Sequence, residues 1–419
     1  MPLLDRGIAI APNNPYGYLA RGVIYRDKKQ YSQALADFNK AIRLDPQLAL
    51  AYYNRGLAYR NQQQYPQALV DYGRAIQLDP QNENNYNDRG NVYLDQEQYP
   101  QALADYNKAI QINPQFAFAY NNRGLVYQNQ ERYPQALVEY SKAIQLDPKY
   151  ETAYRNRGNV YLGQKQYVEA RSDYSKAIQL DPQNVSAYLY RGATYAAQKQ
   201  YSQALADFNK AIQVEPKSVL AYTYRGGVYS EQKQYPQALA DYNKAIQLDP
   251  QNMNVYIYRG DTYFKQDRYP QALADFSKAI QVDPKSVKAY ITRGTFYSMQ
   301  KQYPQALADY SKAIQINPQN ANAYNSRGYI YAIQKQYPQA LADYSKVIQI
   351  NPQNVDAYNS RGDIYSIQKQ YPQALADYSK AIQINPQNAN AYSNRGIIYQ
   401  SQKQYPQALA DYNKAIQLD

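Results

Sequence analysis

The chain repeats one 34-residue sequence pattern from residue 15 to its last residue. An Arg-Gly pair occurs once in each copy, and every interval between neighbouring pairs is 34 residues. A fixed period of this length without insertions is typical of a solenoid built by stacking one supersecondary unit. We take residues 219–252 as the reference copy and name each column of the repeat after its residue there. The twelve arginines are Arg21, Arg55, Arg89, Arg123, Arg157, Arg191, Arg225, Arg259, Arg293, Arg327, Arg361 and Arg395.

Each copy predicts two α-helices. The first covers about 219–232, where Tyr222 and Tyr229 recur at helical spacing. The second begins at a Tyr-Pro pair, and we expect Pro236 at the first helical position, where its missing N–H costs nothing. Pro250 ends the copy, because proline donates no hydrogen bond and disfavours a helical residue before it.

Two columns hold only small residues, with Gly in the Gly226 column and Ala in the Ala238 column of all twelve copies. Glycine inside a helix costs roughly 1 kcal/mol relative to alanine, so its recurrence implies a steric need. We predict that the glycine faces the alanine methyl group and lets two antiparallel helices approach closely, with large tyrosines above and below.

The pattern Y-x2-R-G-x2-Y at 222–229, followed by A-x3-Y-x2-A at 238–245 and by Pro250, resembles the tetratricopeptide repeat. The resemblance implies an all-α fold, a right-handed superhelical solenoid of antiparallel helix pairs whose first helices line a concave groove. Residues 15–419 would form twelve repeats in one continuous solenoid. Residues 1–14 match the end of a repeat, so we interpret them as the remnant of a preceding second helix.

Two columns depart from the usual pattern of this family, with Tyr in place of Trp and with Arg225 in place of Leu. The Asp241 column is acidic in every copy, with Glu139 as its one glutamate. A charge in a semi-buried position needs a partner, because an unpaired buried charge is costly. We therefore predict that Arg225 pairs with Asp241, and that each repeat has an equivalent pair. The alternative is a ladder of arginines that grips an acidic ligand.

The composition argues against catalysis. The chain has no Cys, His or Trp, which excludes thiol nucleophiles, imidazole bases, disulfides and Cys/His zinc sites. Carboxylate chemistry remains formally open, but Asp261 and Asp363 lack a partner pattern for acid–base work. No phosphate-binding glycine loop or EF-hand spacing occurs. We expect no enzymatic activity, no metal and no cofactor.

The formal net charge of +12 is interpreted as an excess of about one positive charge per repeat along a solvated surface. Because it is not gathered into a patch, and because the 34-residue period favours the protein-binding family, a nucleic-acid partner is disfavoured. No apolar run approaches the roughly 20 residues that span a bilayer. The first six residues lack the form of a signal peptide. We expect no membrane span and a cytoplasmic protein.

Aromatic residues outside the framework mark a candidate ligand site. Of the 52 tyrosines, 45 lie in four framework columns, and the other seven are Tyr16, Tyr53, Tyr150, Tyr190, Tyr224, Tyr258 and Tyr329. All but Tyr150 fall on first helices, in columns that the resemblance places in the groove. Tyr190, Tyr224 and Tyr258 occupy one column of three consecutive copies and predict a ladder suited to binding. The alternative is that these rings pack between neighbouring first helices.

Asparagines occupy the same column or the one before it, and they resemble the ladders by which some members of the family hold an extended peptide. An amide side chain can donate to and accept from a peptide backbone. The alternative is an ordinary exposed surface. The predicted groove site consists of Tyr190, Tyr224, Tyr258, Tyr53, Tyr329, Asn54, Asn87, Asn121, Asn122 and Asn156.

The leading functional hypothesis is a non-catalytic scaffold for protein–protein interaction, which takes a peptide or helix of a partner into its groove. One alternative is a structural superhelix that associates end to end, since terminal repeats normally need a polar capping face. Another is a substrate-recruiting module of a larger protein.

Overall fold

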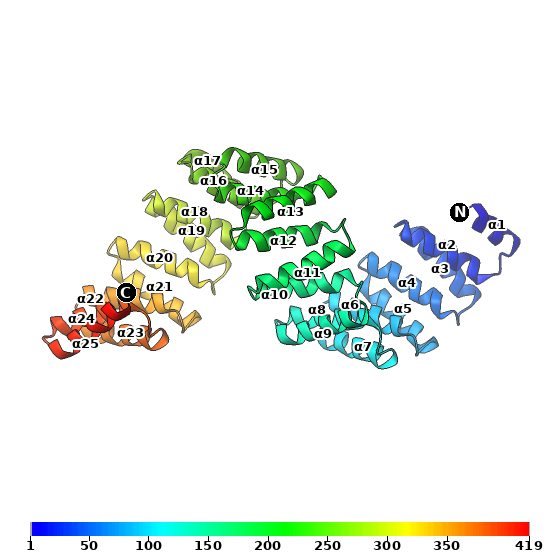
Figure 1. The fold of residues 1–419 in the computed structure, drawn as a ribbon, viewed down its shortest axis with the longest axis horizontal. Helices are drawn as coiled ribbons and strands as arrows, with labels where there is room; N and C mark the ends of the chain where they lie inside the picture. The colour runs from blue at the N-terminus through cyan, green and yellow to red at the C-terminus, as the bar shows by residue number, and fades with distance from the viewer. Residues whose placement is uncertain (1, 419) are drawn as a thin grey trace. The chain divides into compact units, whose positions relative to one another are not determined.

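The computed structural model describes residues 2–418, with side chains from residue 4 onward, and Figure 1 shows its helices. These residues form 25 α-helices and no strand, so the fold is an all-α solenoid of antiparallel helix pairs. Met1 is the first residue of the predicted helix remnant 1–14, and Asp419 is the last residue of the predicted twelve-repeat segment 15–419. Both lie outside the described residues. Contacts divide the chain into two compact units, residues 1–216 and residues 217–419, which are described separately.

Unit 1 begins with the short helix α1 (Pro2–Ile10) and continues with six helix pairs. Its first helices are α2 (Pro15–Asp27), α4 (Ala49–Asn61), α6 (Glu83–Asp95), α8 (Ala117–Asn129), α10 (Glu151–Gly163) and α12 (Val185–Ala197). Its second helices are α3 (Tyr31–Leu44), α5 (Tyr65–Leu78), α7 (Tyr99–Ile112), α9 (Tyr133–Leu146), α11 (Tyr167–Leu180) and α13 (Tyr201–Val214). Each second helix packs on its own first helix and, within the unit, on the next one.

Unit 2 has the same arrangement of six pairs. Its first helices are α14 (Val219–Glu231), α16 (Met253–Phe264), α18 (Val287–Met299), α20 (Ala321–Ile333), α22 (Val355–Ile367) and α24 (Ala389–Ser401). Its second helices are α15 (Tyr235–Leu248), α17 (Tyr269–Val282), α19 (Tyr303–Ile316), α21 (Tyr337–Ile350), α23 (Tyr371–Ile384) and α25 (Tyr405–Leu418). The union of both units in one continuous solenoid of twelve repeats stays a prediction.

The turn between the helices of a pair has the same geometry in every repeat. In α14 the N–H of Gln234 donates to the carbonyl of Tyr229 at 2.8 Å, and the N–H of Lys233 donates to that of Ser230 at 3.0 Å. This is the Schellman pattern, which needs a left-handed residue after the helix. Lys233 supplies it with φ of 59°, although this conformation usually favours glycine.

The second helix starts at the predicted Tyr-Pro pair, but its proline lies one position later than expected. Helix α15 begins at Tyr235, which places Pro236 at its second position rather than its first. The missing N–H of proline still costs nothing there, because the first four amides of a helix have no partner within it.

The framework glycine faces an aromatic ring, which corrects the prediction that it faces an alanine methyl group. A Cβ atom built on Gly226 would lie 3.0 Å from Cε1 of Tyr242 and 3.2 Å from the carbonyl oxygen of Ala238. At Gly192 the nearest atom would be Cε1 of Phe208, at 2.6 Å. The ring of this column is buried between the helices, so the space that the glycine leaves empty is filled by the ring.

Candidate binding surface on the first helices

A repeated ion pair supports the surface of the first helices. Arg225 donates from Nε to Asp241 Oδ2 at 2.8 Å and from Nη2 to Oδ1 at 2.7 Å. Its guanidinium also lies over the ring of Tyr222, 5.6 Å from the ring centroid. Each of the twelve arginines of this column contacts the carboxylate of its own repeat. The guanidiniums are therefore engaged, which argues against a ladder that grips an acidic ligand.

The same arginine often holds the preceding repeat as well. Arg327 binds Asp343 through two nitrogens, and its Nη1 donates to Ser311 Oγ of the previous second helix at 3.1 Å. The planar guanidinium thus joins three helices through its fixed set of donors. Where the acid is Glu139, only Nη2 of Arg123 reaches the carboxylate, and Nε of Arg123 is buried with no partner among the described residues.

Burial affects both members of these pairs. Hydrogen bonding to Asp241 raises the pKa of Arg225, although desolvation opposes the shift. At Asp71, loss of hydration outweighs the hydrogen bonds and charge of Arg55 and raises the pKa of the carboxyl group. A buried pair of this kind is costly to form and still more costly to break by removing one partner.

The predicted tyrosine ladder packs partly on the framework. Tyr190 in unit 1 stacks on Tyr174, with ring centroids 6.0 Å apart. Tyr258 in unit 2 stacks on Tyr242 at 6.4 Å and remains exposed, with Lys288 Nζ 5.2 Å from its ring centroid. Tyr224 is half-buried on α14. Because Tyr190 belongs to the other unit, the ladder of three stays a prediction.

The other two predicted tyrosines differ in exposure. Tyr53 is half-buried, and its hydroxyl donates to Asp88 Oδ2 at 2.6 Å. Burial and the negative charge of Asp88 raise the pKa of Tyr53. Tyr329 is exposed on α20. Of the two hydroxyls, that of Tyr53 is therefore already engaged, whereas the ring of Tyr329 lies open to solvent.

The predicted asparagines lie mostly below the surface, which differs from an exposed peptide-binding ladder. Asn156 Nδ2 donates to Asn121 Oδ1 at 3.0 Å, and half-buried Asn122 donates to Asn87 Oδ1 at 3.0 Å. Asn54 accepts from Arg26. Apart from Asn122, these amides are between 3 and 8 % exposed. They link neighbouring first helices, because a buried amide needs partners, and this geometry lends no support to a role in holding a peptide.

An exposed apolar strip lies on the first helices of unit 2, and of its residues only Tyr329 was predicted as part of a binding site. It consists of Met299, Ile333, Ile367, Tyr329 and Ile397. The exposed fractions of Met299, Ile333 and Ile367 are 62, 42 and 59 %. These three residues share the Glu231 column, which in the eight preceding repeats contains Asp27, Asn61, Asp95, Asn129, Gly163, Ala197, Glu231 and Lys265. The change to large apolar residues at Met299 was the sequence signal for this strip.

A hollow of about 340 Å³ lies at the end of the strip, lined by Ile367, Ile397, Asp363, Tyr378, Asn394 and Ser366. Asp363 Oδ1 accepts from the Tyr378 hydroxyl at 2.7 Å and from Asn394 Nδ2 at 3.0 Å. Partial burial raises the pKa of Asp363, although these two hydrogen bonds oppose the shift. The strip therefore combines apolar side chains with one polar anchor.

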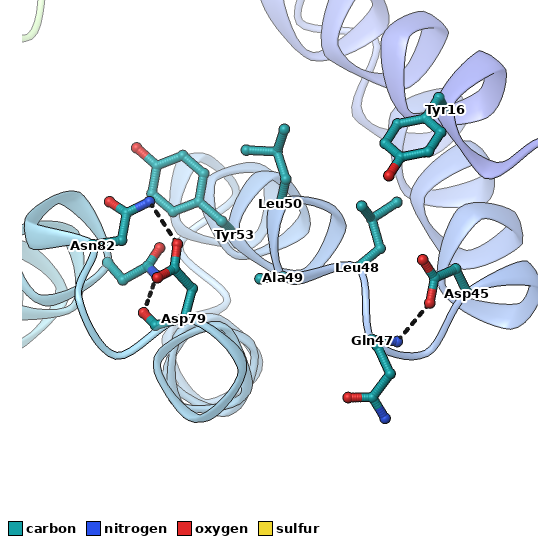
Figure 2. A pocket seen from close by; sticks show the side chains of 10 residues that line it. Tyr16, Asp45, Gln47, Leu48, Ala49, Leu50, Tyr53, Asp79 and Asn82 are labelled. Carbon is teal, nitrogen blue, oxygen red and sulfur yellow. Dashed lines mark hydrogen bonds between the residues drawn. The ribbon is translucent and has the colours of Figure 1, made fainter.

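Unit 1 has a separate hollow of about 430 Å³ (Figure 2). Tyr16 and Leu48 lie on one side, Tyr53 and Asp79 lie on the other, and Leu50 lies between them. Leu48 occupies the N-cap position of α4 without a capping hydrogen bond, whereas most other first helices have Asn or Ser at this position. The hollow combines exposed apolar side chains with acidic and amide groups.

Comparison with protein families identifies the repeat. A family model described as "TPR repeat" matches residues 22–63, 90–131, 129–165, 226–267, 296–334, 328–368 and 362–403. Two models described as "Tetratricopeptide repeat" match residues 49–82, 152–184, 185–218, 254–286 and 389–419, and residues 276–308. The chain belongs to the tetratricopeptide repeat family.

Two of the solved structures that resemble the chain match most of its length at low sequence identity. A yeast Tom70 structure is 16 % identical, with a TM-score of 0.46, and the match covers 88 % of this chain and 92 % of that one. A chain of the APC/C hetero-tetramer Cut9-Hcn1 is 13 % identical, with a TM-score of 0.43 and coverage of 99 % and 89 %. No curated protein matches the sequence.

Tetratricopeptide repeats typically form non-catalytic scaffolds for binding other proteins. Within the described part of the chain, no group of three acidic, Cys or His side chains is placed to hold a metal ion. In residues 2–418, none of the helices combines the length and the apolar character that crossing a bilayer requires.

One carboxyl group of this tetratricopeptide surface gives a pH-dependent prediction. Burial raises the pKa of Asp261 to about 6 from the ordinary value of 3.8, although Lys265 and Lys288 oppose the shift. The folded protein holds this proton more tightly than the unfolded chain. Ionisation of Asp261 therefore lowers the free energy of unfolding as the pH rises from about 4 to about 6, and it has no effect below about pH 4. We expect Asp261→Asn to raise the free energy of unfolding by about 1–3 kcal/mol at pH 7 and by little at pH 4.

Urea unfolding of the parent chain and the Asp261→Asn variant at both pH values measures this effect. The parent serves as its own control at each pH, since all other carboxyl groups titrate equally in the two proteins. A stabilisation of the same size at pH 4 and pH 7 would contradict the role given to the charge of Asp261.

Proposed function

We propose that this tetratricopeptide repeat protein is a protein-interaction scaffold that binds a peptide or helix of a partner in a concave groove lined by its first helices. The family supports a protein-interaction scaffold. The finer assignment to this groove, and to a peptide or helix as the ligand, is the proposal.

The distribution of exposed apolar side chains in unit 2 carries the proposal. Each first helix from α14 to α24 has at least one exposed large apolar residue, and these are Leu220, Tyr258, Met299, Tyr329, Ile333, Ile367 and Ile397. Among the described residues, the second helices α15, α17, α19, α21 and α23 have none, whereas the last second helix, α25, exposes Tyr405, Leu409 and Ile416. From α14 to α24 the exposed apolar side chains therefore lie on the first helices, and such an exposed apolar patch is typical of a protein-binding surface.

Selection from a displayed peptide library against the full chain tests the proposal. We expect peptides that bind with an affinity lowered about tenfold or more by the triple variant Tyr190→Ala, Tyr224→Ala and Tyr258→Ala, or by changes in the apolar strip. Far-UV circular dichroism checks that the helices persist. The matched control is Val70→Ala with Val138→Ala, which alters exposed side chains on second helices.

A result in which only the second-helix control weakened binding would place the ligand on the other surface and refute the proposal. The same holds for a selection that yields no binding peptide. End-to-end self-association stays a separate prediction, which light scattering across a range of concentrations tests.

A further inference from the structure

A row of lysines accompanies the apolar strip. Lys301, Lys335, Lys369 and Lys403 each follow a first helix of unit 2, and all four are exposed. Met299, Ile333 and Ile367 are the last residues of α18, α20 and α22, so each lies two residues before a lysine of this row. Among the described residues, no hydrogen bond or ion pair occupies the ammonium groups of the row.

The geometry that joins strip and row is constant. The four lysines have φ between 57° and 62°, the left-handed residue of the helix-ending turn. Because this turn is hydrogen bonded in the same way each time, every repeat presents its lysine in the same position relative to the end of its first helix. The charge and the apolar group thus recur together.

The combination is confined to one part of the chain. In the first six repeats the lysine column contains Lys29, Gln63, Glu97, Glu131, Lys165 and Lys199, and the apolar column is polar or small. Residues 287–419 contain thirteen Lys and Arg against seven Asp and no Glu, an excess of six out of the total of +12. The last four repeats thus carry half of the net charge on about a third of the chain, because they contain no Glu.

We infer that the apolar strip and the lysine row together bind an acidic amphipathic helix of a partner protein. This inference rests on the proposed function and names the class of its ligand. Aliphatic side chains of the helix would cover Met299, Ile333 and Ile367, and its carboxylates would face the lysines. Complementary charge both steers such an encounter and selects against basic partners.

The spacing of the strip fits a helix. Helices that pack side by side lie about 8–10 Å apart, and the first helices α18 and α20, which carry Met299 and Ile333, contact each other. Residues seven apart on a helix are separated by about 10.5 Å along its axis. An aliphatic residue at every seventh position of the ligand helix can therefore contact the apolar residue of each successive repeat. An acidic residue with the same seven-residue spacing can face the lysine of each repeat.

A protein ligand fits better than an anionic membrane surface, which would also favour apolar and basic groups. The strip ends in the hollow that contains Asp363, whose carboxylate lies beside Ile367 and Ile397. A peptide can donate hydrogen bonds to this carboxylate from its backbone or side chains. Lipid hydrocarbon offers no hydrogen-bond donor to this carboxylate.

A subtractive selection tests the inference. Displayed random peptides long enough for three heptads are first depleted on the variant Met299→Asn, Ile333→Asn and Ile367→Asn, and are then selected on the parent chain. Asparagine already occurs in this column at Asn61 and Asn129, so the fold accommodates it. We expect enriched peptides with aliphatic residues seven apart and with flanking Asp or Glu.

The enriched peptide is then measured by fluorescence anisotropy against charge-reversed chains. Lys301→Glu, Lys335→Glu, Lys369→Glu and Lys403→Glu together should weaken binding about tenfold or more, and a peptide with Lys in place of its acidic residues should bind this variant. Glutamate occurs in the column at Glu97 and Glu131. The matched control is Lys29→Glu, Lys165→Glu and Lys199→Glu, which should change binding less than about twofold.

Three results would overturn the inference. The first is enrichment of neutral or basic peptides, or of none. The second is an equal loss of peptide affinity in the control chain, which would show that the peptide is attracted by positive charge in general. The third is binding of phosphatidylserine vesicles that depends on these residues while acidic peptides do not bind. If peptides bind in a manner that depends on Tyr190, Tyr224 and Tyr258 but not on the strip, the inference fails and the proposed function stands.

Discussion

Replacing Arg327 by leucine should lower the free energy of unfolding by about 3–5 kcal/mol, because it leaves the Asp343 carboxylate buried without its partner. Asp343 is only 4 % exposed, and both of its oxygens accept hydrogen bonds from Arg327. Leucine is the residue that the family usually has in this column, so its size is compatible with the fold. Urea unfolding gives the global effect, and amide hydrogen exchange in α20 and α21 gives the local one, since a repeat array need not unfold in one step.

The double variant Arg327→Leu with Asp343→Leu is the control for this prediction. An apolar pair of similar volume should restore most of the lost stability, because neither residue then carries a buried charge. A single variant that loses less than about 1 kcal/mol, or a double variant no more stable than the single one, would contradict the assignment of the cost to the orphaned carboxylate.

Replacing Gly192 by leucine should lower the free energy of unfolding by about 1–2 kcal/mol, because overpacking at the upper end of its usual cost of about 1–3 kcal/mol outweighs the roughly 1 kcal/mol gained when glycine leaves a helix. A Cβ atom at this position would lie 2.6 Å from Cε1 of Phe208, whose ring is buried and has no space to move into. The measurement is urea unfolding followed by the far-UV helical signal.

Gly163 provides the matched control, because it also lies on a first helix of unit 1 but has no atom within 4 Å of a built Cβ. Gly163→Leu should be neutral or stabilising by up to about 1 kcal/mol. Equal losses in the free energy of unfolding at Gly163 and Gly192 would show that backbone conformation, rather than contact with the ring of Phe208, is the reason for glycine in this column.

The helix pairs follow from the sequence because twelve copies repeat the same signals. Helix α14 ends at Glu231, one residue before the predicted end, and α15 begins at the predicted Tyr-Pro pair. The recurrence of an acid opposite each arginine also pointed to the pairing that the structure contains at Arg225 and Asp241. The structural roles of the framework columns can thus be predicted from the sequence repeat alone.

The orientation of individual side chains was harder to predict. A column assigned to the groove can also border the neighbouring first helix, and the sequence does not show which contact an amide makes. This is why Asn121 and Asn156 were expected to be free for a ligand, whereas they bind each other below the surface. Likewise, periodicity placed Gly226 at a helix contact but did not identify the ring of Tyr242 as its neighbour.

The strip shows a different cause of failure. Its signal was present in the sequence, as the change of one column to Met299, Ile333 and Ile367. Aromatic and amide side chains marked the predicted ligand residues, whereas Met299, Ile333 and Ile367 are aliphatic residues at the ends of their first helices. Comparing each column across all twelve repeats finds them directly.

Site-specific crosslinking tests most directly the claim that a partner lies on the first helices. p-Benzoylphenylalanine is placed at position 333 in α20 and, in a separate chain, at position 138 in α9, where Ile333 and Val138 are both exposed. A selected peptide should crosslink from position 333 and not from position 138. Crosslinking from position 138 alone would contradict the account.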